Sequence, residues 1–91
     1  MSTPTQSRLL ALAKHHPHTR GRWPEGPAET FHHHVTPSRA VSIYTLRPGH
    51  GYLLVWICGG NDDVITYAKH EDALAYARRV ITDLEALGDT P

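Results

Sequence analysis

The segment YLLVWIC, residues 52–58, is apolar at every position. In a β-strand successive side chains point to opposite faces, so Leu53, Val55 and Ile57 would share one face and the residues between them the other. An antiparallel strand with one face in water instead alternates apolar and polar residues. We therefore expect residues 52–58 to form a central strand that is covered on both faces.

Strand and turn signals lie on both sides of this segment. Residues 41–46 (VSIYTL) are rich in β-branched and aromatic side chains, and RPGHG at 47–51 has the composition of a tight turn. A second turn, GGND at 59–62, leads into a further short strand at 63–67. The pattern predicts a three-stranded antiparallel meander.

Helix signals lie at both ends of the chain. Thr3-Pro4-Thr5-Gln6 is typical of a capped helix start, and Pro17 disfavours helix at His16, so we expect this helix to end near Lys14 or His15. Near the other end, Glu71 and Asp72 suit the first turn of a helix because its dipole favours negative charge there. An apolar stripe at helical spacing follows, made of Ala73, Leu74, Ala77, Val80, Ile81, Leu84 and Leu87. We expect this amphipathic helix to pack on one face of the sheet, which gives an α+β fold of order α-β-β-β-α.

With 91 residues the chain makes one small domain. We divide it into an N-terminal helix (1–16), a Pro- and His-rich wrapping or mobile segment (17–39) and a βββα core (40–88). Within the second part, residues 30–36 are also compatible with a short edge strand. The second face of the sheet then has three candidate covers: the first 40 residues of the chain itself, which we favour, a second copy of the chain, or a different partner.

The balanced charge conceals a division along the chain. Residues 1–50 carry six Lys and Arg against two Asp and Glu, a net charge of +4, whereas residues 51–91 carry three against seven, a net charge of −4. Such asymmetry indicates a charged partner or mutual neutralisation within the fold. One cysteine excludes an internal disulfide, and no apolar run is long enough to span a membrane. Residues 1–6 lack the pattern of a secretion signal, so we expect a cytoplasmic protein.

Motifs for catalysis are missing from the sequence. Cys58 lies inside an apolar strand, no serine has the Gly-x-Ser-x-Gly setting, and Gly49-His50-Gly51 lacks the Lys-Ser/Thr that completes a phosphate-binding loop. We therefore expect no enzymatic activity, no cofactor and no small-molecule substrate. The leading interpretation is a non-enzymatic binding or regulatory module that acts through protein–protein contacts, with a homodimer as one form. The candidate partner-binding residues are Tyr44, His50, Tyr52 and Trp56.

Two alternatives remain open. A nucleic-acid-binding accessory protein would use a basic N-terminal arm with an aromatic residue beside it, namely Arg8, Lys14, Arg20, Arg22 and Trp23. A metal-binding protein would use imidazoles from two histidine clusters, namely His16, His18, His32 and His34. The expected element order is similar to that of the double-stranded-RNA-binding domain. That family has basic residues at the start of its last helix, where this chain has Lys69-His70-Glu71-Asp72, so no binding residue is carried over.

Overall fold

The structure, a computed structural model, describes residues 4–87, in which two α-helices pack on a four-stranded sheet. In chain order the elements are α1 (Pro4–His15), the short 3-10 helix η1 (Pro17–Thr19), β1 (Ala28–Thr36), β2 (Arg39–Thr45), β3 (Tyr52–Cys58), β4 (Asn61–Tyr67) and α2 (His70–Ala86). The α+β class and both helices are confirmed. The predicted capping residue Thr3 and the end of the predicted core at residue 88 lie outside the described residues.

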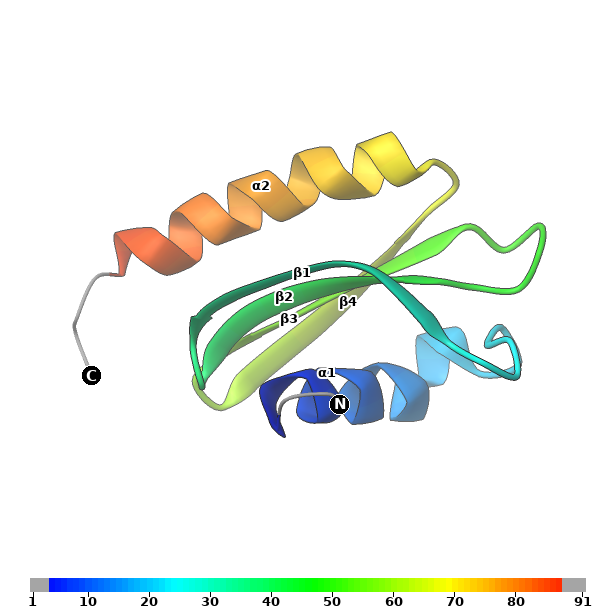
Figure 1. Cartoon of the computed structure of the whole chain (residues 1–91), viewed down its shortest axis with the longest axis horizontal. Coiled ribbons are helices and arrows are strands. Elements are labelled where there is room, and N and C mark those ends of the chain that lie inside the picture. Colours follow the sequence, from blue (N-terminus) through cyan, green and yellow to red (C-terminus); the bar gives the residue numbers. More distant parts are fainter. Residues whose placement is uncertain (1–3, 88–91) are drawn as a thin grey trace.

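The sheet is an antiparallel meander of order β1-β2-β3-β4, which corrects the expected three strands to four (Figure 1). The additional strand, β1, lies within the segment 17–39 that we expected to wrap or move. It pairs with β2 so that Phe31 lies opposite Ile43 and His32 opposite Ser42. The pairing register shifts near each end of β1, between residues 29 and 31 and again between 34 and 36. Pairing with β2 therefore overrides the weak strand propensity of three consecutive histidines.

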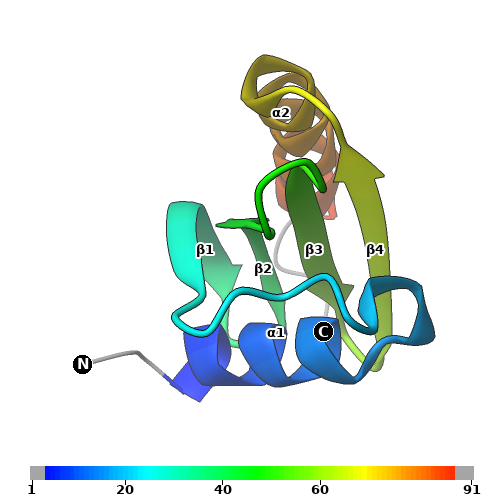
Figure 2. The same ribbon diagram turned by 90° about the vertical axis from the view of Figure 1, so that its right-hand side faces the viewer.

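The central strand β3 is covered on both faces, as its sequence predicts. Leu53, Val55 and Ile57 are fully buried on the α1 side, and Leu54 is fully buried on the α2 side with Trp56 half-buried beside it. Figure 2 shows α1 and α2 on opposite faces of the sheet. The molecule is thus a three-layer α/β/α arrangement built around one strand.

Helix α1 covers the second face of the sheet. Leu9 and Ala13, four residues apart on one helix face, are fully buried against β2 and β3. Trp23 from the connecting segment packs on the same cluster. A helix of 12 residues is marginal alone, so this packing stabilises it; burying Leu9 contributes about 1.5–3 kcal/mol. Of the three candidate covers, the structure shows the first: the chain's own first 40 residues.

Helix α2 covers the other face with a narrower stripe than expected. Ala73, Ala77, Val80 and Leu84 are buried, whereas Leu87, just after the helix, is 46% exposed. The alanines lack long side chains and let the helix approach β2 and β3 closely. Neither helix in the described chain has the length and apolarity needed to cross a membrane.

Candidate binding site at the loop end of the sheet

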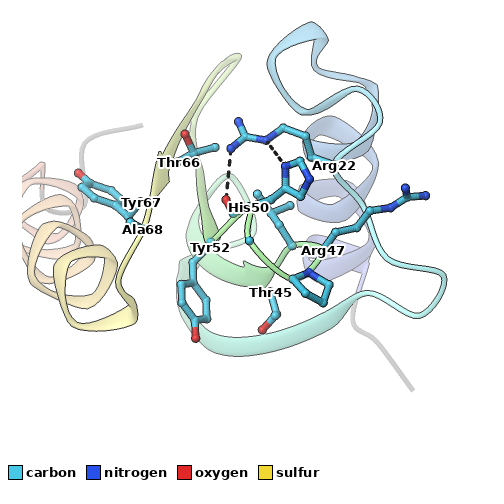
Figure 3. Close-up of a pocket in the computed structure, with 12 residues that line it drawn as sticks. Arg22, Thr45, Arg47, His50, Tyr52, Thr66, Tyr67 and Ala68 are labelled. Carbon is cyan, nitrogen blue, oxygen red and sulfur yellow. Dashed lines mark hydrogen bonds between the residues drawn. The ribbon is translucent and has the colours of Figure 1, made fainter.

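A cavity of about 470 Å³ opens at the end of the sheet where β2 turns into β3 and β4 leads into α2 (Figure 3). We call it the loop-end pocket; its lining residues are Arg22, 45–52 and 66–68. Its volume lies within the range of about 300–1,000 Å³ that is usual for ligand pockets. Two arginines and one histidine line it, and its described lining includes no carboxylate side chain.

The β2–β3 loop owes its shape to glycines. Gly49 and Gly51 have φ angles of +87° and +83°, a region that residues with a Cβ rarely adopt. The His50 amide donates to the Arg47 carbonyl at 2.8 Å, and the Leu46 amide donates to the Gly51 carbonyl at 3.0 Å. A Cβ on Gly51 would collide with the Tyr67 carbonyl oxygen. The loop therefore lies directly against the end of β4, and this contact closes one side of the pocket.

Arg22 joins the connecting segment to this loop. Its Nε donates to Nδ1 of His50 at 3.4 Å, and its Nη2 donates to the His50 carbonyl at 3.2 Å (Figure 3). A guanidinium can only donate, so Nδ1 of His50 accepts and the neutral ring carries its hydrogen on Nε2. The Arg22 carbonyl also accepts from the Arg47 amide at 2.9 Å. The connecting segment and the β2–β3 loop, more than 20 residues apart in the sequence, thus hold Arg22 and His50 side by side.

Arg47 has mainly a supporting role. Its Nε donates to the Trp23 carbonyl at 2.7 Å, and its side chain extends away from Arg22 and His50 (Figure 3). The Trp23 ring packs edge-on against Tyr44, with 5.7 Å between ring centroids. Arg47 therefore anchors the segment that leads from Arg22 into the core.

The four predicted partner-binding residues do not lie together. His50 is exposed in the loop, and Tyr52 lines the pocket but turns its ring away from Arg22 and His50, against His70. Trp56 is half-buried against Tyr76 on the α2 side. Tyr44 is only 3% exposed, so it packs in the core instead of presenting a surface. The pocket brings together two of the four, His50 and Tyr52.

The five predicted nucleic-acid-binding residues are spread along the molecule. Arg22 lines the loop-end pocket, whereas Arg8 donates to the carbonyl of Gly59, in the turn at the opposite end of β3. Lys14 and Arg20 are exposed. Trp23 packs into the α1-side core, where it is not placed to stack on a base.

The two histidine clusters also lie apart. Nδ1 of His16 accepts from the amide of His18 at η1, whereas His32 and His34 belong to β1. Within residues 4–87, no group of three or more His, Cys, Asp and Glu is arranged to hold a metal ion. The proposed four-histidine set is therefore not assembled in this structure.

A polar cluster that the sequence analysis missed lies between α1, β1 and β2. Nδ1 of His32 lies 2.7 Å from the Ser42 hydroxyl, which donates to Oε2 of Glu29 at 3.0 Å. Gln6 of α1 donates to the other carboxylate oxygen at 2.7 Å. Burial lowers the pKa of His32, against the opposing effect of the Glu29 carboxylate. Burial and Glu29 both raise the pKa of Tyr44 well above its usual value.

Serine, histidine and a carboxylate form the relay of many hydrolases, but the geometry here differs from a relay. There the carboxylate holds the histidine nitrogen that faces away from the serine. Here Glu29 and Nδ1 of His32 both contact the same hydroxyl, and Ser42 is fully buried. The cluster ties α1 to the sheet. The cluster depends on the pairing of β1 with β2, which places His32 opposite Ser42 and Glu29 opposite Tyr44, so the sequence alone carries no direct signal for it.

No protein-family model, no curated protein and no solved structure matches this chain. The functional argument therefore depends on the chemistry of the loop-end pocket.

Proposed function

We propose that the protein is a non-enzymatic binding module that contacts a protein partner through the loop-end pocket. The observation that carries this proposal is the meeting of Arg22 and His50 in one concave surface, with Tyr52 at its border. Arginine and tyrosine are enriched in protein interfaces because they combine large contact area with directed hydrogen bonds. Arg47, which is exposed, adds positive charge to the same lining.

The faces and edges of the sheet are less suited to a partner. Its own helices cover both sheet faces. At the β4 edge, the Asp63 carboxylate accepts the Val64 amide at 2.8 Å, and at the β1 edge two register shifts interrupt the regular pairing. Charged side chains and bulges at sheet edges oppose pairing with another strand. These features favour a different protein as the partner over a homodimer formed through the sheet.

The polar cluster supports the non-enzymatic part of the proposal. The hydroxyl group of Ser42 in this cluster is fully buried and already donates to the Glu29 carboxylate. A catalytic serine needs an accessible hydroxyl whose proton passes to a base.

The proposal is tested by selecting partners from a library of displayed random peptides on the immobilised protein. Enriched peptides are then titrated against the wild type, His50→Asp and the control Arg78→Ala, which changes an exposed residue of α2. Placing a carboxylate beside Arg22 should lower affinity by about tenfold or more, since charge-assisted hydrogen bonds contribute about 1.5–3 kcal/mol. Arg78→Ala should bind as the wild type does.

Equal binding by His50→Asp would contradict the proposal. So would a selection that enriches no peptide while a short single-stranded oligonucleotide binds, because the nucleic-acid interpretation would then hold. Melting curves of each variant establish that loss of binding does not come from unfolding.

A further inference from the structure

We infer that Arg22 and His50 form an oxyanion site in the loop-end pocket, which receives a carboxylate or phosphate group. The claim that a partner peptide presents this group rests on the proposed function. Binding of the anion itself depends only on the pocket.

The Arg22 guanidinium has donors to spare. It carries five N–H groups, and Nε and Nη2 donate to Nδ1 and the carbonyl oxygen of His50. Within the described residues, the N–H groups on Nη1 take part in neither of these hydrogen bonds. A planar fork of this kind matches the paired oxygens of a carboxylate or a phosphate.

The fork is held in place before any ligand arrives. Arg22 is half-buried, and its side chain makes two hydrogen bonds to one residue of the β2–β3 loop. Its backbone carbonyl is fixed by the Arg47 amide at 2.9 Å. A long side chain that is already ordered loses less conformational entropy on binding, which favours affinity.

His50 supplies a second donor. Because its Nδ1 accepts from Arg22, its hydrogen lies on Nε2. The ring is exposed and lies next to the Arg22 side chain (Figure 3). The site thus combines a charged fork with a neutral imidazole donor.

The charge of the surroundings selects for an anion. The described lining of the pocket has two arginines and no carboxylate side chain. A concave surface with charge of one sign raises the local concentration of ligands of the opposite sign. Carboxylate and phosphate share the chemistry that this fork recognises, so the source of the group is a matter for the experiment.

The inference is tested by nuclear magnetic resonance titrations with inorganic phosphate and with acetate, measured on the backbone amides of the full chain. Both anions should produce saturable shifts at the amides of residues 22, 47 and 49–51. Arg22→Ala should weaken phosphate binding by about tenfold, the loss expected for a charge-assisted hydrogen bond. Arg22→Lys keeps the charge but not the fork, so it should also weaken binding, and it guards against misfolding of the alanine variant. The control is Arg20→Ala, which removes an exposed arginine of the same segment that does not line the pocket. This variant should bind phosphate as the wild type does.

A second arm identifies the source of the anion. Two peptides that differ at one position, glutamate in one and phosphoserine in the other, are titrated in the same way. Tighter binding of the first assigns a carboxylate, tighter binding of the second assigns a phosphate, and either result supports the site.

The absence of saturable shifts with both phosphate and acetate would overturn the inference. So would an equal loss of affinity in Arg20→Ala, because binding would then reflect general charge. If library peptides bind at the pocket but neither anion binds or competes, the anion site is wrong and the proposed function stands. If the anions bind through Arg22 but no peptide is enriched, the proposed function is wrong and the site stands.

Discussion

Substitution of Gly51 by alanine tests how the loop-end pocket is built. Gly51 has a φ angle of +83°, and a Cβ there would meet the Tyr67 carbonyl oxygen, with the Tyr67 carbonyl carbon at 3.1 Å and the Ala68 Cα at 3.2 Å. All three atoms belong to the backbone, so a side-chain rotation cannot relieve the collision. Gly49→Ala is the matched control, because Gly49 has a φ angle of +87° but open space around its missing Cβ.

The two variants separate backbone strain from collision. The left-handed conformation costs a residue with a Cβ roughly 1–2 kcal/mol, and both variants incur this cost. Overpacking adds about 1–3 kcal/mol at Gly51 alone. We therefore expect the free energy of unfolding to fall by about 2–5 kcal/mol in Gly51→Ala and by about 1–2 kcal/mol in Gly49→Ala.

Urea unfolding followed by circular dichroism measures both changes. In thermal melts each kcal/mol corresponds to a shift of about 4–8 °C for a domain of this size, which makes the difference readily measurable. Gly51→Ala should also weaken phosphate binding more than Gly49→Ala, since it moves the loop that carries His50. Equal destabilisation of the two variants would refute the close approach of the loop to β4.

Three further predictions concern the core, the polar cluster and the α2 face. Leu9→Ala should lower the free energy of unfolding in urea by about 3 kcal/mol, whereas Leu87→Ala should lower it by less than about 1 kcal/mol, because Leu9 is fully buried and Leu87 is 46% exposed. Similar losses of unfolding free energy in the two variants would contradict the packing of α1. His32 has a folded-state pKa below 6.5, so the unfolded state takes up its proton first and the stability should fall as the pH decreases below 6.5. His32→Asn should make the stability–pH profile flatter in that window. An unchanged slope would show that His32 is not the origin of the pH dependence. Trp56→Asp places a carboxylate on a buried face directly opposite Asp63, so it should lower the melting temperature and leave the mass measured by light scattering unchanged. A folded variant with half the wild-type mass would show instead that this face is a dimer interface.

The sequence predicts most of the three-layer arrangement because its apolar pattern is periodic. Residues 52–58 alternate between two buried faces, and the helical stripes at Leu9 and Ala13 and at Ala73 and Ala77 repeat at the spacing of a helix turn. The sequence indicates strand β1 only as an open alternative at 30–36, since its three histidines carry little apolar signal and prolines lie on either side of it. It forms because β2 offers an edge to pair with, which is a tertiary effect.

The candidate site is predictable only in pieces. The sequence predicts that His50 and Tyr52 contact a partner and that Arg22 belongs to a basic arm, but the meeting of Arg22 and His50 depends on a contact across 28 residues of chain. No periodicity encodes such a contact. The sequence indicates Arg47 only as part of a turn, because its hydrogen bond to the Trp23 carbonyl depends on the path of the connecting segment.

Hydrogen–deuterium exchange with a library-selected peptide tests most directly whether the loop-end pocket is the binding surface. We expect the peptide to slow exchange at residue 22, in the loop 46–51 and at 66–68, with the amides of β1 and the outer face of α2 unchanged. Slower exchange confined to β1 or to α2, with the loop 46–51 unaffected, would contradict the account.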